Sequence, residues 1–341
     1  MTPSRHHRSA SPDRAAPADA TPARPSFELL DHRYELLEPL GEGTTGVVYK
    51  ARQRSLGRLV AIKVLRPAIA ADPTWVRRFV NEARVCAHLR HASTVRLFDV
   101  GRTEDGGYFM AMELLEGQSL RAAIEQRAPM PPERVLWILQ QCCASLAEAH
   151  AFGVVHRDIK PDNLFLVEQD APRDLVKVLD FSVAKLCEAR GGVRTEFGVV
   201  FGTPAYMAPE QGLGEVDARA DLYALGVVAY ELLAGRPPFA GPNPLAVLQL
   251  HARVPAPPLP AGLPPIVVAL IGRALEKDPA HRFQSAHEMR AACHHALREL
   301  AAAPIAAADA NRHHRAYWTA ALLGGVALGE LVYIVAGALL A

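Results

Sequence analysis

The amino-acid sequence predicts an α+β chain with two lobes and one C-terminal transmembrane helix. Residues 34–115 carry short apolar runs at strand spacing with one long helical pattern among them, which predicts a small, antiparallel β-rich lobe. Residues 116–298 carry long patterns of helical period, which predict a larger helical lobe. A nearly uncharged apolar stretch at residues 316–341 predicts the membrane helix.

The composition excludes several classes of protein. With 341 residues, of which 50% are hydrophobic and 21% charged, the chain can form a sizeable core and is neither fibrous nor disordered as a whole. A formal net charge of +1 gives no overall basic field, so we expect no nucleic-acid partner. The five cysteines are scattered without a CxxC pair, which argues against a disulfide framework or a zinc site and favours a reducing compartment.

The N-terminal arm, residues 1–33, is expected to be disordered. Pro, Ala, Ser and Arg dominate it before Phe27, and such a segment buries too little apolar surface to offset its ordering entropy. It lacks the apolar run of a signal peptide, which favours a cytoplasmic N-terminus. Contact of its arginines with anionic lipid is the alternative to a solvated tail.

Three strand-like runs open the small lobe, at residues 34–40, 46–52 and 59–65, and a helical pattern follows at residues 75–89. The turn between the first two runs matches GxGxxGxV, with Gly41, Gly43 and Gly46 as its glycines. A dinucleotide-binding fold would need a helix directly after these glycines, whereas here a strand follows. A glycine-rich strand–turn–strand lets backbone N–H groups approach phosphates, although a hairpin turn without a ligand is the alternative.

Further polar residues stand between apolar runs. Lys63 lies within Val-Ala-Ile-Lys on the third strand, flanked by apolar residues. The polar loop 156–163, His-Arg-Asp-Ile-Lys-Pro-Asp-Asn, separates two apolar runs, and Asp180 directly follows the strand-like run 176–179. Long helical patterns occupy residues 132–153 and 220–235 on either side. Each motif alone has a structural explanation, but their order and spacing together predict one catalytic centre.

In this order the motifs resemble those of eukaryotic-like (Hanks-type) bacterial serine/threonine protein kinases, over roughly residues 34–298. The resemblance implies the bilobal protein-kinase fold, with an N-lobe at residues 34–115 and a C-lobe at residues 116–298. It also implies ATP and Mg²⁺ as cofactors, with Mn²⁺ as an alternative, and protein substrates that present Ser or Thr hydroxyls.

The resemblance assigns the catalytic roles to the matching positions. Asp158 would accept the proton of the substrate hydroxyl, and Lys160 in the same loop favours Ser/Thr over Tyr acceptors. Asn163 and Asp180 would hold the metal, and Lys63 would hold the α- and β-phosphates. The residues implied at the nucleotide are Gly41, Gly43, Gly46, Val48, Ala61, Lys63, Glu82, Glu113, Leu115 and Phe165.

Other positions match supporting parts of the family. Glu82 would pair with Lys63, and Met112 would stand as gatekeeper before the hinge at Glu113–Leu115. A structural ion pair is implied between Glu210 and Arg282. Asp221 matches the aspartate that braces the catalytic loop, and Thr203 in GTPAYMAPE matches the segment that docks peptide substrates.

One position departs from the family pattern. Ser182 follows Asp180 and Phe181 where the family has glycine, and its Cβ makes φ > 0 costly. We expect activity to survive with the swing of Phe181 restricted. Ser182 supports one alternative, a catalytically weak, nucleotide-binding pseudokinase that acts as a membrane scaffold. A separate alternative is a small-molecule phosphotransferase with a related cleft, which the GTPAYMAPE segment disfavours.

Thr195 is the candidate regulatory phosphorylation site. It lies between Asp180 and Glu210, eight residues before Thr203. Phosphorylation would add about two negative charges next to a cationic pocket that includes Arg157. An ordinary loop threonine is the alternative interpretation.

The C-terminal part predicts a membrane anchor. A linker at residues 299–315 ends in a basic run, and the apolar stretch 316–341 is long enough to cover a roughly 30 Å bilayer core. The stretch predicts a single-pass protein in contact with lipid, and the flanking arginines predict that its kinase domain lies in the cytoplasm. The resemblance to bacterial kinases implies that the membrane is a bacterial inner membrane. Gly325 and Gly329 form a GxxxG motif that suits a homodimer. A buried C-terminal helix of the preceding domain is the alternative.

Overall fold

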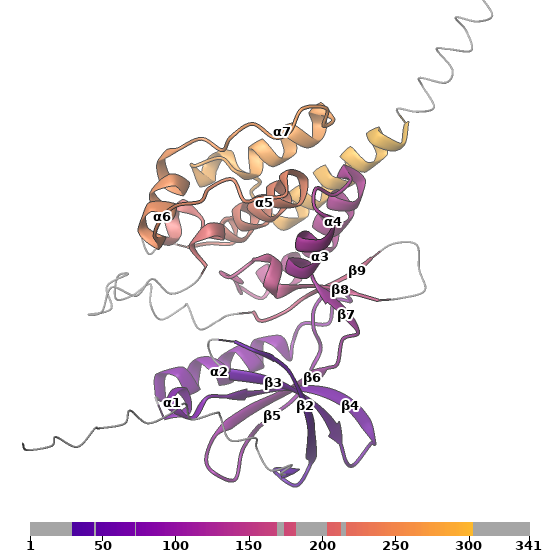
Figure 1. Ribbon diagram of the computed structural model, residues 1–341, viewed down its shortest axis with the longest axis vertical. Coiled ribbons are helices and arrows are strands. Elements are labelled where there is room, and N and C mark those ends of the chain that lie inside the picture. Colours follow the sequence, from indigo (N-terminus) through magenta and orange to yellow (C-terminus); the bar gives the residue numbers. More distant parts are fainter. Residues whose placement is uncertain are drawn as a thin grey trace, which may run out of the picture.

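The computed structural model describes residues 29–43, 46–71, 73–168, 174–181, 203–212 and 216–302, arranged as two lobes (Figure 1). The predicted membrane helix 316–341 with its GxxxG motif, Ser182 and Thr195 lie outside the described residues and stay predictions. In the part of the chain that is described, no helix has the length and apolar character needed to cross a bilayer.

The small lobe is built on one antiparallel six-stranded sheet with the strand order β1-β2-β3-β4-β6-β5. Its strands are β1 (Leu29–Leu30), β2 (Tyr34–Glu42), β3 (Gly46–Gln53), β4 (Arg58–Leu65), β5 (Leu97–Arg102) and β6 (Tyr108–Glu113). Two helices, α1 (Pro67–Ala70) and α2 (Pro73–Cys86), follow β4 and precede β5. The predicted antiparallel lobe with one long helix is confirmed.

Strand β4 is buried on both faces, which explains its nearly continuous apolar sequence. Val60 and Ile62 pack in one cluster with Tyr34, whereas Leu65 packs in a second cluster with Phe79 of α2. Side chains alternate along a strand, so Lys63 shares the second face with Leu65. The strand pattern alone therefore places a lysine inside the lobe.

The large lobe is mainly helical and carries a three-stranded antiparallel sheet at the side that meets the small lobe (Figure 1). The strands are β7 (Gly117–Ser119), β8 (Leu164–Val167) and β9 (Leu175–Val178). The helices are α3 (Leu120–Arg127), α4 (Pro132–Ala151), α5 (Arg219–Ala234), α6 (Pro244–Arg253), α7 (Pro265–Ala274) and a last helix at residues 286–302. Short 3₁₀ turns lie at Pro161–Asn163, Pro204–Tyr206, Pro209–Gly212 and Pro279–His281.

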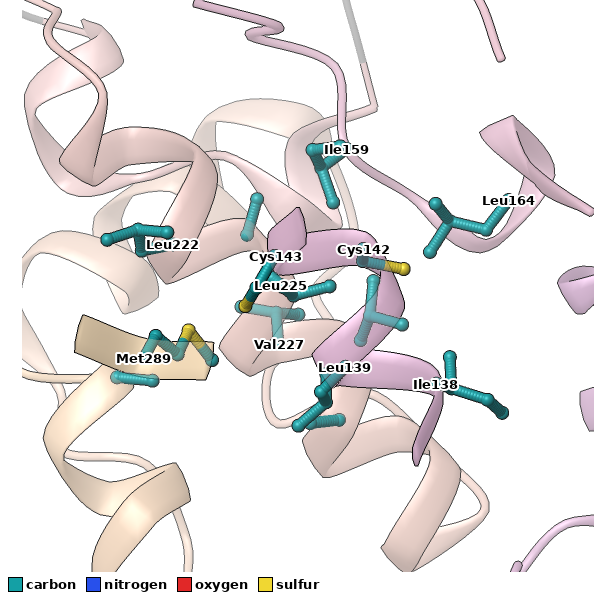
Figure 2. Close-up of a cluster of buried hydrophobic side chains, with 14 of the residues drawn as sticks. Ile138, Leu139, Cys142, Cys143, Ile159, Leu164, Leu222, Leu225, Val227 and Met289 are labelled. Carbon is teal, nitrogen blue, oxygen red and sulfur yellow. The ribbon is translucent and has the colours of Figure 1, made fainter. Parts of the chain in front are cut away.

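Helix α5 forms the centre of the large-lobe core, because nearly all of its residues are buried. Figure 2 shows Leu225 of α5 beside Cys143 of α4, with Met289 of the last helix on the other side. The three cysteines of the described chain that are unbridged, Cys142, Cys143 and Cys293, belong to this core. The core fixes α4 and α5. The loop at residues 156–163 follows α4 in the chain and is bonded to Asp221 of α5.

Candidate active site

The loop at residues 156–163 is held by the buried carboxylate of Asp221 at the start of α5. Its Oδ2 accepts the backbone N–H of His156 at 2.8 Å, and its Oδ1 accepts the N–H of Arg157 at 2.7 Å. The Nε2 of His150 lies 2.8 Å from the same Oδ2. Arg157 adopts a left-handed backbone conformation with φ 64°, which a non-glycine residue keeps only when its surroundings fix it. Asp221 supplies that fixation.

His156 links the catalytic loop to the segment after β9. Its Nε2–H donates to the carbonyl of Leu179 at 2.8 Å, and its Nδ1 accepts the N–H of Asp158 at 3.3 Å. Burial lowers the pKa of the imidazole, which keeps the ring neutral and suits one donor and one acceptor. The ring also packs against Phe181, with centroids 4.8 Å apart. Phe181 is thereby held in the core.

Two polar side chains, those of Lys160 and Asn163, converge on Asp158. The Nζ of Lys160 lies 3.0 Å from Asp158 Oδ2 and donates to Thr203 Oγ1 at 3.3 Å. The Nδ2 of Asn163 donates to the backbone carbonyl of Asp158 at 2.8 Å and to its Oδ2 at 3.1 Å. These donations fix the amide of Asn163, so its oxygen points away from Asp158 and offers a lone pair elsewhere.

Lys63 and Asp180 join the two lobes. The Nζ of Lys63 on β4 lies 3.0 Å from Oδ1 of Asp180, which follows β9. Lys63 is 9% exposed, and Asp180 is held in a left-handed conformation with φ 48°. Glu82, the predicted partner of Lys63, belongs to α2, but its side chain lies outside what the structure describes.

The glycines of the predicted phosphate loop differ in what surrounds them. A Cβ on Gly46 would overlap the carbonyl oxygen of Val64, so Gly46 is needed for the pairing of β3 with β4. Gly41 has open space at the corresponding position, and the N–H of Gly43 closes the turn on the carbonyl of Gly46 at 2.9 Å. Of these glycines, Gly41 and Gly43 leave room for a ligand and Gly46 serves the sheet.

The remaining predicted nucleotide residues lie on strands of both lobes and on the connection between them. Val48 pairs with Lys63 across β3 and β4, and Ala61 pairs with Met112 across β4 and β6. Phe165 lies on β8 of the large lobe, and Leu115 lies in the connection between β6 and β7. The sequence-predicted residues that the structure describes therefore come from both lobes.

The Glu113 side chain contacts the large lobe, which the sequence did not predict. Its carboxylate accepts a bond from Lys177 Nζ at 2.6 Å and from the backbone N–H of Arg96 at 2.7 Å. Any contact of Glu113 with a nucleotide would therefore come from its backbone. Lys177 stands between two valines on β9, and this pattern, the same one that marked Lys63, was the signal that could have identified it.

Comparison with known proteins gives this arrangement its family. Residues 34–297 match the family described as protein kinase domain. The chain belongs to the protein kinase family. The resemblance inferred from the sequence is confirmed, and with it the bilobal kinase fold.

Several relatives of this kinase chain are named serine/threonine-protein kinases. It is 43% identical over 284 residues to pkn2 of Myxococcus xanthus, covering 80% of this chain and 34% of the relative. It is 41% identical over 269 residues to PknB of Mycolicibacterium smegmatis, covering 77% of this chain and 42% of the relative. This kinase chain thus spans between about a third and a half of the length of these curated relatives.

The fold is also similar to a solved structure, the kinase domain of Mycobacterium tuberculosis PknI. The TM-score is 0.60 at 29% sequence identity, and the match covers 80% of this kinase chain and 99% of that chain. The likeness therefore extends over nearly the whole of a kinase domain.

Two oxygen donors in the site suit a divalent cation. The carboxylate of Asp180 and the amide oxygen of Asn163 are hard ligands of the kind that Mg²⁺ and Mn²⁺ prefer. The side-chain NH₂ of Asn163 is already bonded to Asp158, which leaves the oxygen as the group that can ligate. Within the described ranges, no cluster of three or more His, Cys, Asp and Glu side chains offers a metal site.

Proposed function

We propose that this chain is a Ser/Thr protein kinase that transfers the γ-phosphate of ATP to hydroxyl groups of protein substrates, with Mg²⁺ as its metal. One observation carries the proposal: Asp158 is bonded by Lys160 and Asn163, and His156 of its loop bonds to Leu179, directly before the Asp180 that pairs with Lys63. The relatives named serine/threonine-protein kinases support the acceptor type.

Phosphoryl transfer needs positioning and charge neutralisation more than covalent chemistry. Asp158 acts as the base that accepts the proton of the substrate hydroxyl. Lys160 contacts both the Asp158 carboxylate and the Thr203 hydroxyl. It therefore keeps the carboxylate oriented and holds the chain segment around Thr203 beside the base. Each of these groups is held by hydrogen bonds before any substrate arrives, so little reorganisation is needed during transfer.

Lys63 neutralises the phosphates of the nucleotide. Its ammonium is a compact charge on a flexible stem, so it can turn from Asp180 to a phosphate without leaving its buried position. Asn163 and Asp180 would hold the divalent cation, which neutralises phosphate charge when bound. Gly41 and Gly43 place no side chain at this turn, so there is room for phosphates to approach it.

The direct test is incubation of the full chain with labelled ATP and Mg²⁺, beside Asp158→Asn and Lys63→Met variants. Label on the chain itself and on a generic basic protein, lost in both variants, supports the proposal. Nucleotide binding by thermal shift without any transfer would instead favour the pseudokinase scaffold. Ser182→Gly would then be the first variant to examine, because Ser182 is the one residue that supports that alternative.

We further propose that phosphorylation of Thr195 activates the kinase, probed by mass spectrometry of an active preparation made in cells. Arg157 supports this proposal, because its backbone is fixed beside the catalytic base and its guanidinium could receive the phosphate. Active protein that is unmodified at Thr195 would refute it.

We also propose that residues 316–341 anchor the kinase in the inner membrane of a bacterium, as a homodimer through Gly325 and Gly329. Their apolar composition and GxxxG spacing support this. Fractionation of the full chain and of a variant truncated at residue 310 tests the anchor. Gly329→Ile is expected to weaken self-association in detergent, and unchanged association would contradict the dimer.

A further inference from the structure

Arg121 lies among polar side chains beside the catalytic loop. It stands in the first turn of α3, whose N-terminus is capped by Ser119. Its Nη1 donates to Glu231 Oε1 of α5 at 2.8 Å, and its Nη2 donates to the hydroxyl oxygen of Tyr206. The hydroxyl of Tyr206 in turn donates to Glu231 Oε2 at 2.5 Å. The Nε of Arg121 lies 3.7 Å from Oδ2 of Asp162.

These four residues, Arg121, Asp162, Tyr206 and Glu231, form what we call the Arg121 cluster. It holds two carboxylates and one cation. The Glu231 side chain is 4% exposed, that of Arg121 is 29% exposed and that of Asp162 is 52% exposed. The guanidinium therefore lies between a buried carboxylate and a solvent-exposed one. If its side chain were removed, a cation from solution would find two carboxylates and a phenol oxygen in its place.

The Arg121 cluster borders the place where a substrate must lie. Asp162 belongs to the same loop as the base Asp158, four residues further along. Tyr206 belongs to the 3₁₀ turn that follows Thr203, the residue bonded by Lys160. A peptide that brings its hydroxyl to Asp158 must pass over residues of this loop or this turn. Its neighbouring side chains can therefore reach the cluster.

We propose that Arg121 determines the charge preference of the kinase: it fills, from within the chain, a carboxylate site that would otherwise select a basic residue near the substrate hydroxyl. The inference rests on the proposed kinase function and names the substrate class. The unmodified enzyme takes peptides with neutral or acidic side chains at this position at least as well as basic ones. A guanidinium bound at two carboxylates leaves little binding energy for a second cation.

The test uses the full chain and threonine peptides that differ at one residue. Arg, Gln or Glu is placed in turn at each of several positions on both sides of the threonine, and kcat/KM is measured. The Arg/Gln ratio is kcat/KM for the Arg peptide divided by kcat/KM for the Gln peptide. For the unmodified enzyme this ratio is expected to be at most about one at every position. The Arg121→Ala variant is expected to raise that ratio roughly five- to tenfold at one or two positions, chiefly through KM, since a charge-assisted bond is gained.

Three further experiments distinguish a role of Arg121 in substrate specificity from a role that only stabilises the fold. The double variant Arg121→Ala/Glu231→Gln is expected to return the Arg/Gln ratio to about one, because the inner carboxylate is gone. Arg121→Lys keeps the cation and should keep the original preference. Methylguanidinium added to Arg121→Ala should compete with the Arg peptide and lower its ratio. A bracing role alone would move none of these ratios.

A second single variant keeps the inference testable if Arg121→Ala does not fold. Glu231→Gln releases the guanidinium from its inner partner, and the Glu/Gln ratio is then expected to rise. If the folded variants transfer phosphate to peptides but their Arg/Gln and Glu/Gln ratios do not change, the proposed role of Arg121 is overturned. The kinase function would still hold. Absence of transfer to any peptide or protein by the unmodified chain would overturn the proposed function itself.

Discussion

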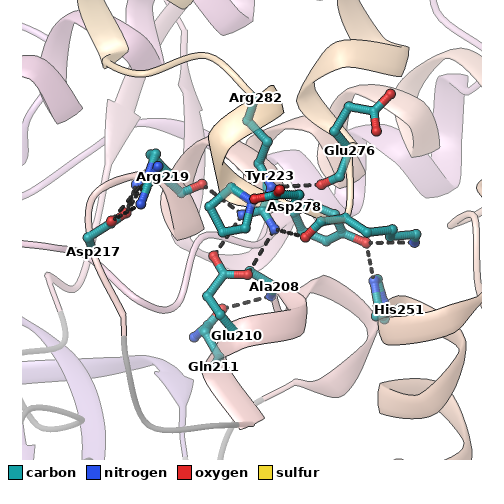
Figure 3. A network of polar contacts seen from close by, with 12 residues as sticks. Ala208, Glu210, Gln211, Asp217, Arg219, Tyr223, His251, Glu276, Asp278 and Arg282 are labelled. Atoms are coloured by element: carbon teal, nitrogen blue, oxygen red, sulfur yellow. Dashed lines mark hydrogen bonds and ion pairs between the residues drawn. The ribbon is translucent and has the colours of Figure 1, made fainter.

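Two cation–carboxylate pairs in this molecule each join residues far apart in the sequence, but their surroundings differ. Lys63 and Asp180 meet at 3.0 Å between the lobes, with side chains 11% and 37% exposed. Arg282 and Glu210 meet through two bonds of 2.7 and 2.8 Å inside the large lobe, with Arg282 fully buried (Figure 3). Solvent reaches the carboxylate of the first pair, whereas the second is a bidentate pair whose guanidinium is shielded from solvent.

The buried pair is also tied to the backbone. The guanidinium of Arg282 donates to the carbonyls of Glu276 at 2.7 Å and Lys277 at 2.9 Å and packs 4.7 Å from the ring of Tyr223. A planar fork with its donors engaged cannot change partners, while a lysine ammonium can. The difference teaches that the type of cation and the exposure of the carboxylate separate a charge suited to chemistry from one that braces the fold.

Replacement of Lys63 should produce the largest effect, and on activity alone. Lys63→Met is expected to lower phosphoryl transfer roughly 10³-fold, since a preorganised charge at the phosphates is lost. The melting temperature should change by no more than about 2 °C, because the partner Asp180 remains accessible to water. Labelled-ATP assays and thermal melts measure both. A large loss of stability would show that this pair also braces the fold.

Replacement of Arg282 should act on stability. Arg282→Met leaves the Glu210 carboxylate without its partner inside the lobe and is expected to lower the free energy of unfolding by about 3–5 kcal/mol. Urea titration followed by circular dichroism measures it. The matched control is Arg282→Met/Glu210→Gln, which removes the unpaired charge and should recover part of the loss. Equal losses in both variants would contradict the charge argument.

The glycines offer the same contrast on a smaller scale. Gly46→Ala places a Cβ against the carbonyl of Val64 and should lower stability by about 1–3 kcal/mol through displaced strands. Gly41→Ala meets open space, so its stability should stay within about 0.5 kcal/mol, and its effect should fall on KM for ATP. Urea titration and ATP kinetics on both variants separate the roles. Equal losses of stability in Gly46→Ala and Gly41→Ala would contradict the separate structural and nucleotide-binding roles of these glycines.

The smallest expected effect concerns Lys277, whose ammonium packs 4.5 Å from the ring of Phe239. Burial, and then the charge of Arg282, lower the pKa of Lys277 from 10.5 to about 8. Between pH 8 and 10.5 the unfolded chain therefore binds more protons than the folded one, and stability from this group rises with pH. Relative to Lys277→Met, the melting temperature of the unmodified chain should rise by about 1–2 °C from pH 8 to 10, since partial exposure of the group weakens the effect. A pH-independent difference would show that the ammonium is fully solvated.

Much of the site could be predicted because its residues stand in short, ordered motifs. The carboxylate of Asp158, the amide of Asn163 and the lysine within Val-Ala-Ile-Lys are each recognisable from their immediate neighbours. Helices of the large lobe were equally visible; α4 covers Pro132–Ala151 where residues 132–153 were expected. Strands β5 and β6 were not singled out, because their stretch contains charged and glycine-rich segments that blur the period.

Other residues gave no local signal. Arg121 is one arginine in an ordinary amphipathic turn, and its partners Tyr206 and Glu231 lie far along the chain. His150 resembles any polar residue near a helix end until Asp221 is found 2.8 Å away. The sequence does not reveal whether a polar side chain is surrounded by water or lies against a carboxylate from a distant part of the chain.

By itself the sequence determined the family and the two lobes and predicted the reacting groups, because strand and helix periods and the order of short motifs are local properties. The tertiary structure decided which charge meets which. It gave Asp180 to Lys63 and Glu231 to Arg121, and it confirmed the pairing of Glu210 with Arg282 that the resemblance implied. Only packing sets the distance and the exposure of each pair, and these two quantities fix the strength of an electrostatic interaction and hence its role.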